Sequence, residues 1–263
     1  MLKTRLITAS FLIPLILGSV YFGGLVFFAL VTFALLFAGD EFFKMARGAG
    51  YRTMPTIGWA LIALFVWNAY DPVDYFRPIL VGALVVTLII GVFRHAEGWL
   101  AGWAITLAGA LYIGGLGAYF LLVRALPQGE VWTTLALVTA WATDTGAYLA
   151  GTRLGKHKFF PAISPKKTWE GAIGGWIAAP LAMLALGWLF GLPLVHCAIL
   201  GFLIGIAATF GDLAESLLKR QTGVKDSSNI VPGHGGILDR LDSLLFTAVV
   251  TFYYLVWVMR IGN

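Results

Sequence analysis

Long apolar stretches alternate with short polar segments along almost the whole chain of 263 residues. A helix needs about 20 predominantly apolar residues to cross the hydrocarbon core of a membrane, and about 17 suffice for a short span. By that measure the pattern predicts about nine membrane-spanning helices. They run approximately over residues 6–22, 24–43, 57–70, 76–93, 99–123, 131–150, 171–190, 194–210 and 241–259.

Composition supports this interpretation. Hydrophobic residues make up 59% of the chain and charged residues only 12%, which is typical of multi-span membrane proteins. We therefore expect one all-α polytopic integral membrane domain over residues 1–263, in contact with the lipid bilayer and without a soluble module. The first apolar run has a basic start but no convincing small-residue cleavage site, so we expect it to remain as a span.

The basic residues are unevenly distributed between the loops. With a cytoplasmic N-terminus, every Lys and Arg except Arg77, Arg124 and Arg260 falls on the cytoplasmic side. Since cytoplasmic loops are rich in Lys and Arg, we expect a cytoplasmic N-terminus and, with an odd number of spans, an extracytoplasmic C-terminus. Basic and aromatic residues do not interleave as in nucleic-acid binders, so no nucleic-acid partner is expected. The single Cys197 excludes an intrachain disulfide.

The segment Ser216–Asp242, SLLKRQTGVKDSSNIVPGHGGILDRLD, is unusually rich in charge for so apolar a chain. Its basic side chains suit phosphate oxygens, and its glycines let backbone amides approach an anion closely. The residues concerned are Lys219, Arg220, Lys225, Gly235 and Gly236. His234, in the same segment, is interpreted as a structural or phosphate-bonding residue, because a lipid phosphate is already anionic and needs no general base.

Four acids lie just before this segment or in its last residues. Asp212 and Glu215 are three residues apart at the end of the eighth span, and Asp239 and Asp242 are three apart at the start of the ninth. Each pair lies on one helical face, and four convergent carboxylates would repel one another without a cation. A magnesium site shared with a nucleotide triphosphate is one interpretation. The other is a set of interfacial ion pairs with basic neighbours, namely Lys219, Arg220 and Arg240.

Two further elements carry polar chemistry. Asp144 lies within the sixth span, where an ionisable group suggests function, although a packing Asp near the helix end is the alternative. The run Ser164-Pro-Lys-Lys-Thr-Trp-Glu-Gly predicts a helix capped by Ser164 with Pro165 at its first position, and thus a phosphate site beside Lys166, Lys167 and Thr168. The alternative is a basic loop that only touches anionic lipid headgroups.

Three segments resemble one known family. The run S-x-L-K-R-x4-K-D-x-S-x3-P-x-H-G-G-I-x-D-R-L-D is similar to the signature of the phosphatidate cytidylyltransferases, also called CDP-diacylglycerol synthases. D-x-x-A-Y-x-x-G from Asp144 and S-P-K-K-T-x-E-G from Ser164 resemble further segments of that family. The resemblance covers about the last half of the chain, and it places the catalytic elements within residues 140–243.

The resemblance implies that CTP and phosphatidic acid react, with Mg²⁺, to give CDP-diacylglycerol and pyrophosphate. The implied catalytic residues are Asp212, Asp239, Asp242, Lys225, Lys219 and Arg220. The implied substrate-binding residues are Asp144, Ser164, Lys166, Lys167, Thr168, Ser216, Gly235, Gly236, His234 and Arg240. The implied metal ligands are Asp212, Asp239, Asp242 and Glu215, and a second cation is left open. We expect an inner (cytoplasmic) membrane location with the active site facing the cytoplasm, and a homodimer is left open.

Two other functions are kept as alternatives. A CTP-dependent polyprenol or lipid kinase would release CDP rather than pyrophosphate. A transporter would account for many spans and for Asp144, but it would favour matched inverted repeats, which are not found.

Further interpretations concern individual acids and glycines. Asp40 and Glu41 could reach the active site, but a solvated helix end is expected for them. Gly114 could loosen the fifth span around an acyl chain, but packing is expected. Glycine pairs such as Gly171 and Gly175, or Gly187 and Gly191, are also expected in helix packing.

Overall fold

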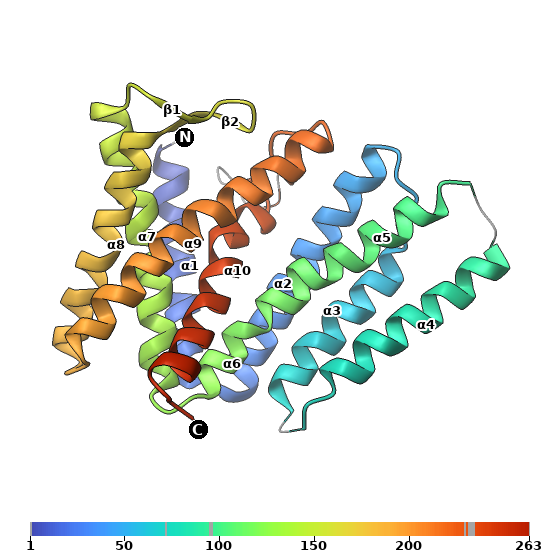
Figure 1. Cartoon of the computed structure of the whole chain (residues 1–263), viewed down its shortest axis with the longest axis horizontal. Helices are drawn as coiled ribbons and strands as arrows, with labels where there is room; N and C mark the ends of the chain where they lie inside the picture. The colour runs from blue at the N-terminus through green and yellow to red at the C-terminus, as the bar shows by residue number, and fades with distance from the viewer. Residues whose placement is uncertain (1, 72, 95–96, 229, 231–234, 263) are drawn as a thin grey trace. The chain divides into compact units, whose positions relative to one another are not determined.

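The computed structural model describes residues 2–71, 73–94, 97–228, 230 and 235–262. The expected all-α fold is confirmed, and within these residues one short β-hairpin interrupts the helices (Figure 1). The helices are α1 (Leu2–Phe22), α2 (Gly24–Gly48), α3 (Pro55–Tyr70), α4 (Phe76–Arg94), α5 (Trp99–Ala110), α6 (Tyr119–Ala125), α7 (Gly129–Leu154), α8 (Trp169–Leu189), α9 (Leu194–Gln221) and α10 (Leu238–Tyr253). Leu111–Gly115 and Tyr254–Val258 form π-helical turns, and the hairpin strands are β1 (Lys158–Phe160) and β2 (Ser164–Thr168).

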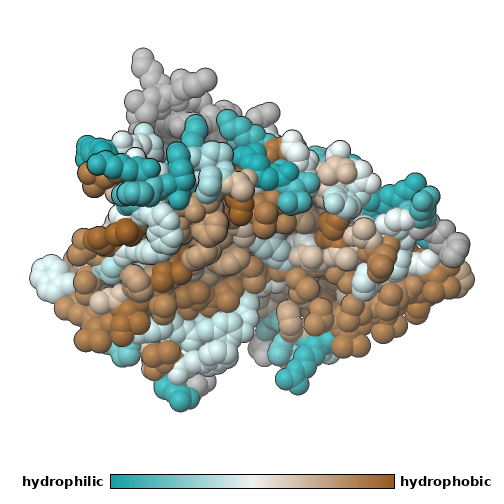
Figure 2. Space-filling model, turned by 45° about the horizontal axis from the view of Figure 1, so that its top comes forward, coloured by the Kyte–Doolittle hydropathy of each residue, from teal (hydrophilic) through white to brown (hydrophobic). Residues whose placement is uncertain are grey.

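Each of the nine predicted spans coincides with a helical segment of the described chain. Six of the segments there are long and apolar enough to cross a membrane: α2, α4, Trp99–Ala125, α8, α9 and Leu238–Val258. The apolar stretches Ser10–Phe22 and Pro55–Tyr70 are shorter. Large apolar side chains face outward on these helices, for example Phe93 and Trp188, as expected of a polytopic membrane protein (Figure 2).

Helix α7 is long but less apolar, because it is rich in threonine. The hydroxyls of Thr143, Thr145 and Thr152 each donate a hydrogen bond to a backbone carbonyl four residues earlier, at 2.7–2.8 Å. A hydroxyl bonded within its own helix does not need water. These three threonines of α7 are therefore compatible with apolar surroundings.

The chain packs as two compact units. The first comprises Met1–Leu122 and Gln221–Arg240. Within it α3 packs against α2, α4 and α5 (Figure 1). Gly114 packs against the backbone of Ile62, since a Cβ added to Gly114 would lie 2.7 Å from the Ile62 Cα. The expected packing role of this glycine is thus confirmed.

The second unit comprises Val123–Arg220 and Leu241–Asn263, and its most extensive helix contact joins α7 and α8. Small residues bring the two backbones together. A Cβ added to Gly171 would lie 3.0 Å from the Ala147 carbonyl oxygen, and one added to Gly175 would lie 2.9 Å from that of Thr143. Small-residue spacing therefore brings these helices together, as predicted.

One glycine predicted to pack has another role. Gly191 follows the end of α8 with a φ of +67° and has no neighbour within 4 Å of an added Cβ. Its N–H donates to the Trp188 carbonyl at 3.2 Å. Gly191 therefore turns the chain out of the helix, where a left-handed conformation favours glycine.

We expect alanine substitutions to separate packing glycines from exposed ones. At Gly82, where nothing lies within 4 Å of an added Cβ, Gly82→Ala should raise the free energy of unfolding by about 0.4–1 kcal/mol. At Gly174 the new Cβ would collide with Ala150 and approach the Gly146 carbonyl oxygen at 3.0 Å. Gly174→Ala should therefore lower the free energy of unfolding by about 1–3 kcal/mol. Unfolding in one detergent measures both, and equal effects would contradict the packing.

Candidate functional site

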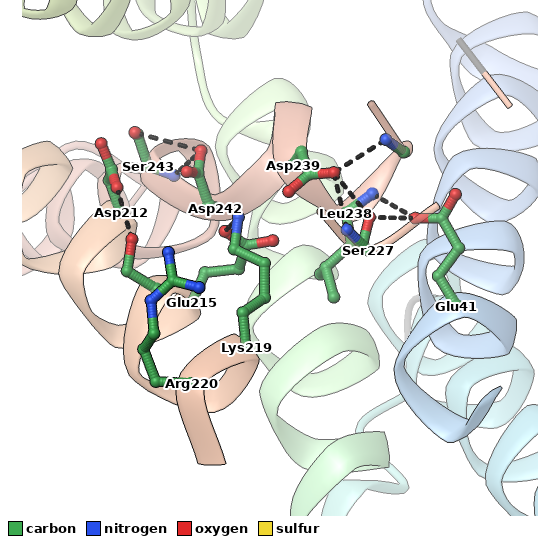
Figure 3. A network of polar contacts seen from close by, with 12 residues as sticks. Glu41, Asp212, Glu215, Lys219, Arg220, Ser227, Leu238, Asp239, Asp242 and Ser243 are labelled. Carbon is green, nitrogen blue, oxygen red and sulfur yellow. Dashed lines mark hydrogen bonds and ion pairs between the residues drawn. The ribbon is translucent and has the colours of Figure 1, made fainter. Parts of the chain in front are cut away.

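The carboxylate of Glu41 organises the polar part of the first unit. Glu41 lies near the end of α2 and is only 1% exposed. Its Oε1 accepts hydrogen bonds from Ser228 Oγ at 2.6 Å and from Ile237 N at 3.0 Å. Its Oε2 accepts from Ser227 Oγ at 3.0 Å and from Leu238 N at 2.8 Å (Figure 3). The expected solvated helix end is thus wrong for Glu41, because these four donors replace water.

Asp239 belongs to the same network. Its Oδ2 accepts from Ser227 N at 3.0 Å, from Ser227 Oγ at 2.8 Å and from Gly236 N at 2.8 Å (Figure 3). Gly235 precedes this contact with a φ of +82°, a conformation that favours glycine. Two parts of the signature segment, around Ser227 and around Gly236, are therefore tied together at the first turn of α10.

The end of α9 carries the acids of the second unit. The helix continues to Gln221, so the signature residues Ser216–Gln221 are helical rather than part of a loop. Asp212 is half-buried and accepts a hydrogen bond from Ser216 Oγ at 3.2 Å. Glu215 is fully buried and forms an ion pair with Lys219 one turn later. For Glu215 the ion-pair interpretation is therefore correct, and its role as a metal ligand stays a prediction.

The β-hairpin holds a lysine against Asp212. Lys167, on β2, lies with its Nζ 2.9 Å from Asp212 Oδ2. Phe159, on β1, is buried and packs with Ala172 of α8 and Leu213 of α9. Glu170 closes the hairpin by accepting hydrogen bonds from the backbone N–H of Lys156 and of His157, at 3.1 and 3.2 Å. Local packing thus fixes Lys167 beside the acid.

The expected capping by Ser164 is wrong. Ser164–Thr168 is extended and pairs antiparallel with β1, with Phe160 opposite Ser164 and Lys158 opposite Thr168. The cap of α8 is Thr168, whose Oγ1 accepts a hydrogen bond from Gly171 N at 3.2 Å. Threonine also caps helices well, and strand pairing with β1 makes the later start favourable.

Asp242 lies among charged groups of the second unit. Asp212, Asp144 and Lys219 are all close enough to interact with its charge. Its Oδ1 accepts from Ser243 N at 2.6 Å and from Ser243 Oγ at 3.2 Å (Figure 3). The backbone of α9 approaches closely here, because a Cβ at Gly211 would lie 2.6 Å from the Asp242 carbonyl oxygen. Two predicted metal ligands, Asp212 and Asp242, are therefore brought together.

These carboxylates fit a magnesium ion. Within the described residues no group of three or more His, Cys, Asp or Glu side chains is arranged to hold a metal. Mg²⁺ commonly binds through one or two carboxylates and completes its coordination with water and substrate phosphates. Like-charged carboxylates at close range also favour a cation between them. Asp212 and Asp242 are the pair with these properties in the second unit.

The other predicted site residues differ in exposure. Asp144 is exposed on α7, and Ser216 is buried on α9. Arg220 is exposed, and its Nε donates to the Ile163 carbonyl at 3.3 Å. Lys166, Lys225 and Arg240 are exposed, Gly235 is half-buried and Gly236 is buried. His234 lies outside the described residues.

Comparison with known proteins accounts for this combination of a polytopic helical fold and charged clusters. A family model described as the cytidylyltransferase family matches residues 3–258. The chain belongs to this family. Membership makes it a nucleotidyltransferase, and it explains why three polar segments of the chain resemble segments of the phosphatidate cytidylyltransferases.

Relatives of the family match almost the whole chain. A protein of Synechocystis sp. named phosphatidate cytidylyltransferase is 33% identical over 292 aligned residues, which cover 98% of each chain. One of the same name from Pseudomonas aeruginosa is 35% identical over 269 residues, covering 98% of this chain and 97% of its own. Another from Bacillus subtilis is 46% identical over 157 residues, covering 57% and 56%.

Sequence reasoning considered that Glu41 could reach the active site but preferred a solvated helix end, and it did not single out Ser227. Their hydrogen bond joins positions 186 residues apart. The available signal was indirect, since an acid directly followed by Phe42 and Phe43 in an apolar helix has to be either exposed or bonded to partners.

We expect the cap at Thr168 to be measurable. Thr168→Ala should lower the free energy of unfolding by about 1 kcal/mol, because the Gly171 N–H loses its acceptor, whereas Thr168→Ser keeps the hydroxyl and most of the stability. Chemical unfolding in detergent compares the three proteins. An alanine variant as stable as the serine variant would contradict capping by Thr168.

Proposed function

We propose that this family member transfers a cytidylyl group from CTP to phosphatidic acid, giving CDP-diacylglycerol and pyrophosphate. The observation that carries the proposal is the family match over residues 3–258, together with relatives of that name aligned over nearly the full chain. The carboxylates and the lysine at the end of α9 supply groups suited to phosphate chemistry.

The reaction needs no covalent intermediate on the protein. An oxygen of the lipid phosphate attacks the α-phosphorus of CTP, a new P–O bond forms, and the bond to the β-phosphate breaks as pyrophosphate leaves in line. The lipid phosphate is already anionic near neutral pH, so the attack requires no general base. Catalysis then depends on positioning and charge stabilisation.

The protein's own residues divide these tasks. Asp212 and Asp242 would hold magnesium, which when bound neutralises charge on the triphosphate and on the departing pyrophosphate. Lys167, ion-paired with Asp212, is placed to exchange that partner for a phosphate oxygen. Arg220 is exposed at the residue after Lys219 and suits bidentate phosphate contact. The predicted roles of Asp239, Lys225 and a second cation remain proposals of the same kind.

The location follows from the substrates and from the distribution of basic residues. CTP is a cytoplasmic nucleotide and phosphatidic acid is a membrane lipid, so the reaction requires a site at the cytoplasmic surface. Because Lys and Arg gather in the loops predicted to be cytoplasmic, we propose that the enzyme lies in the inner (cytoplasmic) membrane with its polar segments facing the cytoplasm. A homodimer stays open.

A nucleotide series tests the proposed reaction. Purified protein in detergent, supplied with phosphatidic acid and Mg²⁺, should release pyrophosphate and form CDP-diacylglycerol in equal amounts with CTP. ATP, GTP and UTP should give far less product. Release of CDP with a phosphorylated lipid would instead indicate a kinase. Solute or ion movement in proteoliposomes, without nucleotide lipid, would indicate a transporter.

Substitution of the paired acids tests the metal assignment. We expect Asp212→Asn and Asp242→Asn each to lower kcat by at least about 100-fold, because a neutral amide is a weaker magnesium ligand than a carboxylate and the metal would be lost from the reacting phosphates. Glu130→Gln is a suitable control, since Glu130 lies in the first turn of α7 and pairs with Arg124 at 3.5 Å. Full activity in both Asn variants would contradict the assignment, as would full activity in Asp239→Ala for that residue.

A further inference from the structure

The negative charge of Glu41 is unexpected at its position on α2. It lies on an apolar helix, has buried neighbours in Phe42 and Phe43, and is 1% exposed. A buried carboxylate is strongly unfavourable unless hydrogen bonds replace its hydration. Stability alone would favour an apolar side chain of similar volume. A buried Glu with several donors therefore points to a role in fixing the segments that supply those donors.

The donors come from both ends of one segment. Ser227 and Ser228 precede the central part of the signature, and Ile237 and Leu238 follow it. Leu238 is the first residue of α10, so two of the four donors are backbone N–H groups at a helix start, which favour an acceptor with negative charge. Glu41 thus acts as the cap of α10 from 197 positions away in the chain.

The network continues from Glu41 to Asp239. Ser227 Oγ lies 3.0 Å from Glu41 Oε2 and 2.8 Å from Asp239 Oδ2. Ser227 N and Gly236 N bind the same Asp239 oxygen. A Cβ on Gly236 would lie 2.5 Å from Glu41 Oε2. The glycine of the signature is therefore required for the two carboxylates to share this short segment.

We propose that Glu41 is a positioning residue, which ties the parts of the signature segment around Ser227 and around Leu238 to α2 and through Ser227 holds the Asp239 carboxylate in its orientation. This inference rests on the proposed function for its effect on catalysis, but its structural part does not. Glu41 itself contacts no reacting group in this proposal.

Glu41→Gln tests the inference at constant side-chain volume. Each carboxylate oxygen of Glu41 accepts one backbone N–H, from Ile237 or from Leu238. A glutamine has one acceptor oxygen and one NH₂ donor, so in either orientation its NH₂ faces an N–H. We expect hydrogen exchange at the Ile237 and Leu238 amides to rise by roughly 10-fold or more.

The amides of Ser227 and Gly236 show whether Glu41 also fixes Asp239 or only anchors the segment to α2. Ser227 N and Gly236 N bind Asp239 rather than Glu41, so they should exchange faster in Glu41→Gln only if Glu41 also fixes Asp239. The amides of α3 should keep their protection. Exchange is measured without substrate or metal. In the activity assay kcat should fall by roughly 10- to 100-fold, as for residues that orient a functional side chain.

Asp40→Asn is the matched control. It removes one negative charge from the adjacent position of α2, where Asp40 pairs with Lys44 at 2.6 Å, and it should change neither exchange in the signature segment nor kcat. Ser228→Ala, a milder variant, removes the 2.6 Å hydroxyl donor to Glu41, together with the acceptor of the Ile230 N–H at 3.2 Å. It should shift the same amides in the same direction by less, and it serves if Glu41→Gln does not fold.

Hydrogen exchange tests the structural part of the inference independently of the reaction, and kcat tests its effect on catalysis. Faster exchange confined to the four amides, together with a lower kcat, would support it. Unchanged exchange at these amides, an equal increase throughout α3, or full kcat despite the exchange pattern would overturn it. A wild-type protein without cytidylyl transfer would refute the proposed function, whereas the exchange pattern would still test how Glu41 holds Asp239.

Discussion

Within the described residues, the buried charged side chains have partners inside the protein, because a buried ion loses its hydration. Glu41 shows this constraint most directly, since its carboxylate accepts four hydrogen bonds from the signature segment. The same constraint applies in the second unit, where buried Glu215 is paired with Lys219. Removing an ion from water is strongly unfavourable unless partners replace its hydration. Each of these buried carboxylates therefore requires its neighbours to lie within bonding distance.

Close backbone packing provides the second constraint. In the absence of a hydrophobic driving force between helices in lipid, small residues allow the contact that holds them together. Helices α7 and α8 meet through Gly171 and Gly175, and α8 begins where the β-hairpin ends. The hairpin thereby carries Lys167 to Asp212 on α9. The lysine that we propose as a phosphate ligand is therefore attached to the pair of helices with the most extensive contact in the second unit.

The sequence predicted the helices far better than their ends. Apolar runs reveal a span, but Ser216–Gln221 continues α9 through a polar stretch because Lys219 finds its partner Glu215 one turn earlier. The sequence predicted Ser164 as a helix cap, but Ser164 pairs with β1 in a strand and Thr168 caps α8 instead. Both differences arise where local propensity permits two structures and a tertiary contact chooses between them.

The amino-acid sequence by itself determined the membrane class, the approximate helices and the polar segments that identify the family. Those properties depend on local composition and on residue spacing within one segment. Only the tertiary structure decided that Glu41 is buried and that Asp212 pairs with Lys167 near enough to Asp242 for the two carboxylates to interact. It also decided that Asp239 is bonded to Ser227 and Gly236. Hydrogen bonds and ion pairs between distant segments depend on how the helices pack, and no spacing along the chain records that packing.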